Sequence, residues 1–158
     1  MIYQNKNKEE FVLKDKDLIN KSLKLNNVGK YEQALEILLK FEKKYPKSSK
    51  LNGIIATTYS YMKNIEKSTI YFKKTSSLSP SSELASLGLF LGLLKLNEYK
   101  DAFNEFNRFL DAHEPKNYKV TIQELYEQID ESTPEYQRDL LEKYYNKYID
   151  VRKKGEMK

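Results

Sequence analysis

The sequence predicts an all-α protein built from a repeated pair of helices. The first observation is a period of 34 residues, over which apolar, small and proline positions recur three times. The second is the spacing within each copy, where apolar residues lie three and four positions apart and therefore share one face of a helix. The third is composition, since 39% of the 158 residues are apolar and 32% are charged, which provides enough material for a core. The recurring positions are Tyr31, Ala34, Leu38, Phe41 and Pro46, then Ile65, Ser68, Phe72, Thr75 and Pro80, then Tyr99, Ala102, Phe106, Phe109 and Pro115, the last proline being one residue late.

The first copy indicates where its two helices begin and end. Residues 26–29 predict a turn, in which Gly29 can adopt a positive φ without steric cost and so end a helix. The following segment places apolar residues at i, i+3, i+4, i+7, i+8 and i+10 counted from Tyr31, as a helix with one apolar face would. Pro46 cannot continue a helix, so the second helix is expected to stop before it.

Small and hydroxyl side chains occupy two further recurring positions. Ala34, Ser68 and Ala102 are predicted to lie where the two helices of a pair approach closely. Residues 48–49 and 81–82 are serines that follow Pro46 and Pro80, where the next helix needs an N-cap oxygen.

The period and this order of helix, turn, helix and proline resemble the tetratricopeptide repeat (TPR) family. The resemblance implies a right-handed α-solenoid of three helix-turn-helix repeats over residues 15–48, 49–82 and 83–116, within a single domain. The sequence departs from the family at the glycine between the helices, which is Lys63 in the second repeat and Asn97 in the third. The family's tryptophan in the first helix of each repeat is replaced by Leu18, Asn52 and Ser86.

Residues 117–153 are predicted to form C-terminal capping helices, because the last repeat of an array cannot bury its own apolar side. The segment Thr121-Ile-Gln-Glu124 has the pattern of a capping box and predicts a helix that reaches about Asp130. Thr133-Pro134 predicts the start of another helix, with an N-cap threonine followed by proline in the first turn. That helix has an amphipathic stripe that reaches about Val151 and consists of Tyr136, Leu140, Leu141, Tyr144, Tyr145, Tyr148 and Ile149.

The composition limits the kinds of site and the cellular location that we expect for this protein. Cysteine is absent, which excludes disulfide scaffolds and thiolate metal sites. No apolar stretch follows Met1, and the longest apolar run, 84–94, is about half of a membrane span, so a cytoplasmic protein without membrane contact is expected. Residues 1–14 are expected to be an N-terminal arm and 154–158 a frayed, lysine-rich tail.

The net charge of +5 is unevenly distributed along the chain. Residues 1–50 carry 12 basic and 7 acidic groups, whereas residues 101–158 carry 10 and 13. This asymmetry is compatible with an acidic partner at the N-terminal repeats, and also with the lysine and asparagine bias of an AT-rich genome. Only 3 of the 28 basic residues are arginine, the side chain best suited to phosphate and base contacts, so no nucleic-acid partner is predicted.

The sequence offers little on which enzymatic chemistry could be built. The one histidine, His113, lies in a predicted loop and is interpreted as a solvated side chain. The five glycines are scattered, so no loop can cradle a phosphate, and Gly88-x-x-x-Gly92 is interpreted as a place of close helix packing. We therefore predict no catalytic residue, no metal site and no cofactor.

The resemblance implies a concave groove lined by the first helix of each repeat. Carried over through helix positions of the family, the predicted partner-binding residues are Lys16, Ile19, Leu23 and Asn27, then Lys50, Thr57 and Tyr61, then Leu84, Leu87, Leu91 and Lys95. The chaperone-binding members of the family hold a peptide carboxylate with a clamp of lysine, asparagine and arginine. Here those positions are occupied by Ile19, Leu23, Leu84 and Gly88, so the clamp is missing and a co-chaperone of heat-shock proteins is not expected.

The predicted first helix of the third repeat is apolar nearly all round over residues 84–96, and such a helix must be covered on every side. Either the tyrosine-rich C-terminal helix folds back over it, or a partner protein or second copy of the chain covers it. The same alternatives apply to four tyrosines of the C-terminal helix, which pack into the cap or form an interface: Tyr136, Tyr144, Tyr145 and Tyr148.

These features predict a non-enzymatic protein–protein interaction module. The first hypothesis is a small standalone bacterial adaptor that occludes one partner, in the manner of an immunity protein against a toxin or a chaperone of a secreted effector. The second is a self-associating scaffold, with a homodimer as its simplest form.

Overall fold

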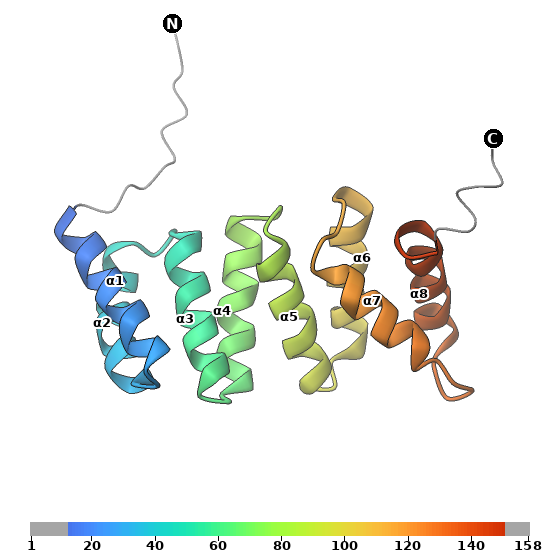
Figure 1. The fold of residues 1–158 in the computed structure, drawn as a ribbon, viewed down its shortest axis with the longest axis horizontal. Coiled ribbons are helices and arrows are strands. Elements are labelled where there is room, and N and C mark those ends of the chain that lie inside the picture. Colours follow the sequence, from blue (N-terminus) through green and yellow to red (C-terminus); the bar gives the residue numbers. More distant parts are fainter. Residues whose placement is uncertain (1–12, 151–158) are drawn as a thin grey trace, which may run out of the picture. The chain divides into compact units, whose positions relative to one another are not determined.

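The computed structural model describes residues 13–150, and this part of the chain is all-helical (Figure 1). The all-α fold class is therefore confirmed. Residues 1–12 of the predicted N-terminal arm and residues 151–158, which include the predicted tail, lie outside the described residues. The helices are α1 (Leu13–Asn27), α2 (Tyr31–Lys44), α3 (Ser49–Tyr61), α4 (Ile65–Leu78), α5 (Glu83–Lys95), α6 (Tyr99–Ala112), α7 (Tyr118–Glu127) and α8 (Glu135–Tyr148).

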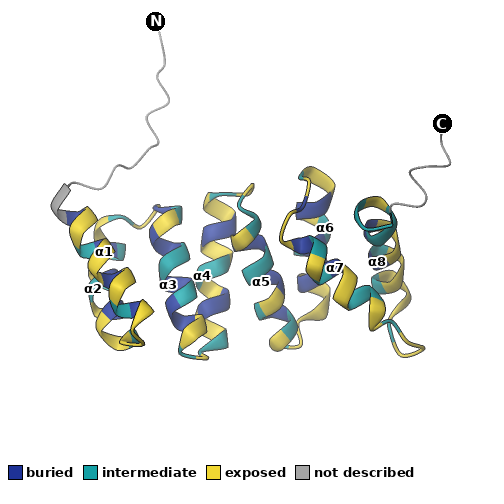
Figure 2. Ribbon diagram, viewed as in Figure 1, coloured by how far each residue is buried: buried dark blue, intermediate teal, exposed yellow. Residues whose placement is uncertain are grey.

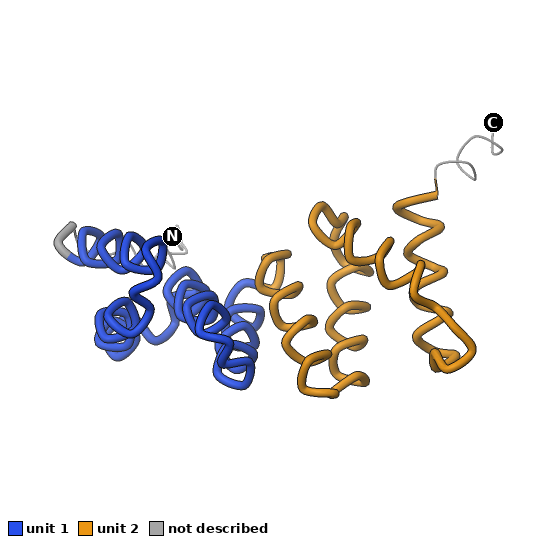
Figure 3. The backbone as a smooth tube through the Cα atoms, turned by 60° about the horizontal axis from the view of Figure 1, so that its bottom comes forward, with its two compact units in different colours: residues 1–79 blue, residues 80–158 orange. Residues whose placement is uncertain are grey.

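The chain divides into two compact units, residues 1–79 and residues 80–158 (Figure 3). In the first unit α1 packs on α2, α2 on α3 and α3 on α4. In the second unit α5 packs on α6, α7 packs on α8, and α8 also contacts α6. Each unit is described by itself below.

The 34-residue period reappears in the helix boundaries. The second helix of each pair begins at Tyr31, Ile65 and Tyr99, and the turn before it contains one residue with a positive φ. That residue is Gly29 (φ +75°), Lys63 (φ 59°) or Asn97 (φ 61°), so lysine and asparagine adopt the conformation predicted for glycine. The same hydrogen bonds close all three turns, with the backbone N–H of Lys30, Asn64 and Glu98 donating to the carbonyls of Leu25, Tyr59 and Leu93.

The predicted helix ends before Pro46 and Pro80, and the predicted serine N-caps of the helices that follow, are confirmed. α2 ends at Lys44, before Pro46, and α4 ends at Leu78, before Pro80. The hydroxyl oxygens of Ser48 and Ser82 then accept hydrogen bonds from the backbone N–H of Leu51 (3.3 Å) and Ala85 (3.4 Å). These two serines are therefore the N-caps of α3 and α5.

The core of the first unit is mostly aliphatic with a polar component. Figure 2 shows its buried segments in dark blue. Its main cluster of buried apolar residues consists of Ile19, Ala34, Leu35, Leu38, Phe41, Leu51, Ile55 and Tyr59. Polar side chains are buried among the same helices, and Asn26 Nδ2 donates to Thr58 Oγ1 over 2.7 Å, which joins α1 to α3. Ser68 is buried where a small residue was predicted, and its hydroxyl donates to the Ala56 carbonyl of α3 (3.0 Å).

The core of the second unit is aromatic. Phe106 lies at its centre, fully buried, with ring centroids 5.1 Å from Phe90 and 5.5 Å from both Tyr118 and Tyr144. These rings come from α5, α6, α7 and α8, so one cluster holds all four helices of the unit together.

Two predicted helix starts in the C-terminal region are wrong. α7 begins at Tyr118, so Thr121 lies inside the helix and does not cap it. α8 begins at Glu135 with Pro134 as its N-cap residue, while the Thr133 hydroxyl accepts a hydrogen bond from the backbone N–H of Asp130 (3.0 Å). At α7 the local pattern is overridden by a contact with Glu83 described below, whereas at α8 the Thr133 hydroxyl is used by the preceding turn.

Candidate functional site

The predicted partner-binding residues fall on both units, and one of them is wrong. Ile19 is only 2% exposed and belongs to the core of the first unit, where it packs with Leu38 and Ile55. Its side chain is therefore unavailable to a partner, because the turn of α1 that carries it faces α2 and α3. The helix position carried over from the family could not reveal this burial, because an isoleucine fits either a core or an apolar groove.

The other predicted residues of the first unit reach the surface to different extents. Lys16, Asn27 and Lys50 are exposed, Leu23 is 36% exposed, and Thr57 is half-buried with its hydroxyl donating to the Gly53 carbonyl (3.0 Å). This surface is mostly polar, and its lysines stand at the start of α1 and α3.

Tyr61 is the most exposed aromatic residue of the first unit's predicted surface. Its side chain is 55% exposed and stacks on the ring of Tyr31, with the centroids 5.6 Å apart and the planes inclined by 29°. The stack fixes the ring at the end of α3 while one face remains in solvent, which suits a binding contact because little side-chain freedom is left to lose.

In the second unit the predicted residues form a row of apolar side chains along α5. Leu84 and Leu91 are 69% and 41% exposed, and Leu87 and Leu94 are half-buried. We call these four residues the leucine stripe. Lys95 is exposed at its C-terminal end.

The opposite side of α5 faces the core. The buried residues on this side, away from the stripe, are Ala85, Ser86, Leu89, Phe90 and Leu93. α5 thus has two apolar faces, and only one of them is used in packing on α6.

The tyrosine-rich C-terminal helix does not fold back over the leucine stripe. α8 packs on α6 and α7, and Leu84 and Leu91 stay exposed although both helices belong to the same unit. The first of the two alternatives for covering this helix is therefore excluded within the unit, and a partner or a second copy remains.

The four predicted tyrosines of α8 have different roles. Tyr144 is fully buried, and its hydroxyl donates to the side-chain oxygens of Asn107 and Asp111, the latter over 3.0 Å. Burial, together with the hydrogen bond to Asp111, raises the pKa of Tyr144 to about 12. This tyrosine is a core residue of the cap and not an interface residue.

The remaining tyrosines of α8 keep part of their surface in solvent. Tyr145 stacks on Tyr126 of α7 with a centroid distance of 3.9 Å, and the Tyr148 hydroxyl donates to the Leu110 carbonyl (3.1 Å). Tyr136 is 46% exposed and meets the ring of Phe103 edge-on at 6.2 Å. Tyr136 is therefore the member of this group best placed for contact with another molecule.

Sequence reasoning missed the role of Glu83, which connects α5 to α7. Its carboxylate accepts hydrogen bonds from the backbone N–H of Lys116 (2.8 Å), the backbone N–H of Tyr118 (2.8 Å) and the side-chain amide of Asn117 (3.1 Å). Burial opposes ionisation of Glu83, but these hydrogen bonds outweigh it and lower the pKa of the carboxyl. A carboxylate 33 to 35 residues away in the sequence thus caps α7, and no local pattern could indicate it.

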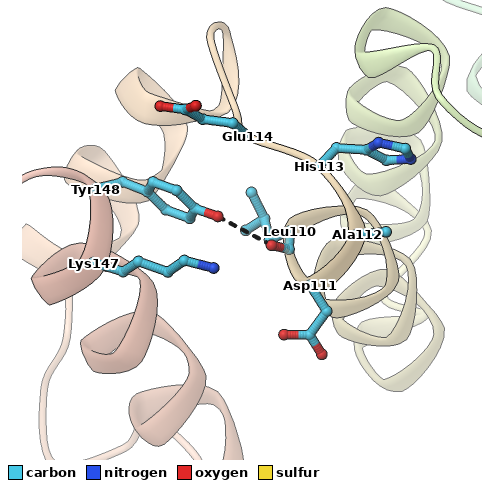
Figure 4. Close-up of a pocket in the computed structure, with 7 residues that line it drawn as sticks. All are labelled: Leu110, Asp111, Ala112, His113, Glu114, Lys147 and Tyr148. Carbon is cyan, nitrogen blue, oxygen red and sulfur yellow. Dashed lines mark hydrogen bonds between the residues drawn. The ribbon is translucent and has the colours of Figure 1, made fainter.

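A shallow hollow of about 480 Å³ lies between the end of α6 and the last turn of α8 (Figure 4). Its lining residues are Leu110, Asp111, Ala112, His113, Glu114, Lys147 and Tyr148. The Asp111 carboxylate is already engaged by the Lys143 ammonium (2.9 Å) and the Tyr144 hydroxyl, and the lining contains no serine, threonine or cysteine.

Within residues 13–150, no group of three or more histidine, cysteine, aspartate or glutamate side chains is arranged to hold a metal ion. In the same range, no helix is both long and apolar enough to cross a membrane.

Comparison with known proteins gives a match in structure but not in sequence. No protein-family model matches the chain, and no curated protein matches it. Among solved structures, the TPR domain of Sgt2 from Aspergillus fumigatus is similar, with a TM-score of 0.58 and 14% sequence identity. The match covers 80% of this chain and 95% of that domain. The chain has the tetratricopeptide repeat fold. The predicted resemblance is thereby confirmed at the level of the fold, and the positive-φ residues at 29, 63 and 97 mark the turn of each TPR helix pair.

Proposed function

We propose that this chain is a protein–protein interaction module that binds one partner protein through the exposed face of its helix pairs and its C-terminal helices. The observation that carries the proposal is the leucine stripe on α5, an apolar row that the chain's own C-terminal helix leaves uncovered. The TPR fold supports it, because repeat proteins of this kind use the surfaces of their helix pairs for binding. The exposed and pre-stacked Tyr61 provides a second anchor of the type found at interfaces.

The finer proposal is a cytoplasmic bacterial adaptor that acts by steric occlusion. It would cover a functional surface of a toxin, as an immunity protein does, or an aggregation-prone segment of a secreted effector, as a dedicated chaperone does. Both mechanisms need a few buried anchors surrounded by charge and no catalytic group. In the first unit Tyr61 and the lysines near the starts of α1 and α3 support this proposal, and in the second unit the leucine stripe and Lys95 do.

A tagged pull-down from lysate of the source organism, followed by mass spectrometry, tests this proposal. The expected result is one near-stoichiometric partner, whose affinity falls in Tyr61→Ala or Leu91→Ala. Ile70→Ala is a matched control, because Ile70 is also 55% exposed but lies on α4, outside the predicted surface. Circular dichroism must first show that each variant is folded; unchanged partner affinity in both folded variants would exclude the assignment of this surface.

The alternative function is a self-associating scaffold in which a second copy covers the leucine stripe. The observation in its favour is the same exposed apolar face, which a second copy of α5 could bury. Light scattering on the purified chain distinguishes the two functions: a monomer at micromolar concentration supports the adaptor, whereas a dimer that Leu91→Ala dissociates supports the scaffold.

A further inference from the structure

Asn52-Gly53 is the one place in the sequence where a glycine follows an asparagine. The residue after an asparagine decides how easily its side-chain amide is lost, because the backbone nitrogen of that residue is the attacking group. Glycine has no Cβ to shield this nitrogen, and its backbone reaches the conformations that the attack needs. Asn52 is therefore the asparagine of this chain whose covalent neighbour favours deamidation most.

The reaction proceeds through a cyclic imide. The Gly53 nitrogen forms a bond to Cγ of Asn52, which closes a five-membered succinimide ring. The bond between Cγ and Nδ2 breaks, and the Nδ2 group leaves as ammonia together with the proton that the Gly53 nitrogen gives up. Water then adds to one of the two ring carbonyls and opens the ring, so the product is aspartate or isoaspartate.

The folded chain holds Asn52 in a geometry that prevents this attack. Its side chain is fully buried in α3, and Nδ2 donates to the carbonyls of Ser48 (2.8 Å) and Pro46 (3.3 Å). Both acceptors precede α3, so the amide is directed away from the Gly53 nitrogen, which follows it in the chain. Gly53 lies within α3, where each backbone N–H is engaged by the carbonyl four residues earlier. The reaction therefore requires α3 to open.

The same contacts make the products incompatible with the fold. Asn52 Oδ1 is buried and accepts no hydrogen bond from any of the described residues. An aspartate would replace the donating Nδ2 by a second oxygen against the Ser48 and Pro46 carbonyls, and would bury its charge there. An isoaspartate adds one carbon to the main chain, and the hydrogen-bond pattern of an α-helix cannot continue through it.

The fold does not require glycine at position 53. Gly53 lies within a helix and is not among the residues with a positive φ. A Cβ there would meet the Thr75 side chain at 3.6 Å, which is an ordinary van der Waals contact. Alanine is also more favourable than glycine inside a helix. Gly53→Ala is therefore expected to keep the first unit folded while it removes the reactive neighbour of Asn52.

We propose that Asn52 is a deamidation site that the folded chain closes and that opening of α3 exposes. A chain whose first unit stays open long enough is converted to a product that cannot rebuild the unit, so opening becomes irreversible loss. The rate of deamidation then measures how often α3 opens. This inference is independent of the proposed function, because it concerns the covalent lifetime of the first unit and not its partner.

The first test compares the folded and the unfolded chain. The full chain is incubated in mildly alkaline buffer with and without guanidinium chloride, and deamidation is followed by mass spectrometry of the tryptic peptide 51–63. Deamidation of Asn52 should be at least about a hundredfold slower in the folded chain. In guanidinium chloride Asn52 should react before Asn27 and Asn97, because a larger residue follows each of these two asparagines.

The Gly53→Ala variant separates the chemistry from the opening. In guanidinium chloride both chains are unfolded, so the variant should deamidate at Asn52 about tenfold more slowly or less, for want of the glycine alone. After removal of the denaturant, the fraction of the wild-type chain that fails to regain its circular dichroism should equal the fraction modified at Asn52. Gly53→Ala incubated in the same way should refold.

The recombinant Asn52→Asp variant tests the product directly. Its folding equilibrium constant should be at least about tenfold lower than that of the wild type, because a buried amide becomes a carboxylate. The matched control is Asn20→Asp, which makes the same change at an exposed position of α1 and should alter this constant by less than about threefold.

Each measurement has a result that would overturn the inference. Equal rates at Asn52 with and without denaturant would show that the fold does not close the site. Faster reaction of another asparagine in guanidinium chloride, or an unchanged rate in Gly53→Ala, would refute the assignment to Asn52-Gly53. Deamidated chains that refold completely, or Asn52→Asp as stable as Asn20→Asp, would show that the product is compatible with the fold.

Discussion

Glu83 provides the sharpest test of how the C-terminal helices are attached. Its Oε1 accepts the backbone N–H of Lys116 and of Tyr118, and its Oε2 accepts the Asn117 side chain. The perturbations are Glu83→Ala, which removes all three hydrogen bonds, and Glu83→Gln, which keeps one carbonyl oxygen but no charge. If this carboxylate is what starts α7 at Tyr118, both variants must destabilise the second unit.

The magnitude follows from the contacts. A hydrogen bond to a charged group contributes about 1.5–3 kcal/mol when buried, and loss of a helix N-cap costs about 0.5–2 kcal/mol. Glu83 is half-buried, so solvent replaces part of what Glu83→Ala removes. We expect a loss of about 2 kcal/mol for Glu83→Ala and about 1 kcal/mol for Glu83→Gln.

The measurement is urea denaturation followed by circular dichroism at pH 7, with hydrogen exchange of the α7 amides as a local readout. Glu98 supplies the control, because it is a glutamate at the N-cap position of α6 in the same unit and its side chain makes no capping hydrogen bond. Glu98→Gln should therefore change the free energy of unfolding by less than about 0.5 kcal/mol.

The pH dependence gives an independent check on the charge. The pKa of Glu83 is lowered from 4.5 in the folded protein, so the folded state prefers the ionised form. The contribution of the charge is fully present above pH 4.5 and is lost as the pH falls through the lowered folded pKa. The difference between wild type and Glu83→Gln should shrink over that range. A difference that stays constant from pH 7 to about pH 3, or Glu83→Ala as stable as Glu98→Gln, would refute the reasoning.

Three further predictions concern the turns and the aromatic core. Lys63→Gly should stabilise the chain by about 0.5–1 kcal/mol, because relief of the left-handed strain exceeds the added entropy of the unfolded glycine, while Gly29→Ala should destabilise it by about 1 kcal/mol. A Cβ at Gly29 meets nothing within 4 Å, so a loss in urea melts reports backbone strain alone, and no change in either variant would contradict this account. Tyr144→Phe keeps the packed ring but loses the hydrogen bonds to Asn107 and Asp111, so unfolding should become easier by about 1 kcal/mol; an unchanged melt would show that these bonds contribute nothing net. Phe106→Ala should cost about 3–5 kcal/mol in the same assay, since three rings lose their common neighbour, and a cost below about 1 kcal/mol would mean that the cluster does not hold the unit together.

The repeats could be predicted from sequence because the signals for their helix ends are local. Gly29, Pro46 and Ser48 each act on the backbone within a few residues, and the same offsets returned 34 residues later. Even the departures at Lys63 and Asn97 did not mislead, because the hydrogen bonds that close the turn determine the conformation more strongly than the residue type does.

The C-terminal region was harder because its signals are not local. The Thr121 pattern is a sound helix start by itself, yet the Glu83 carboxylate from α5 moves the start to Tyr118. The burial of individual residues could not be predicted from the local sequence either. Ile19 and Leu23 are both apolar residues of α1, and only the packing of α2 and α3 decides that the first is 2% and the second 36% exposed.

In α5, the residues that the fold needs can be distinguished from the exposed residues that are available for binding. A first helix in this repeat needs one apolar face, and Ala85, Leu89, Phe90 and Leu93 provide it. α3 meets the same need with a solvent side that contains Lys50, Thr57 and Ser60. Leu84 and Leu91 on the outer side of α5 stay exposed and are not part of this buried face, and exposing them carries a cost in solubility. Neither α6 nor the C-terminal cap covers these two leucines, and for that reason the proposed function assigns this face to a binding partner.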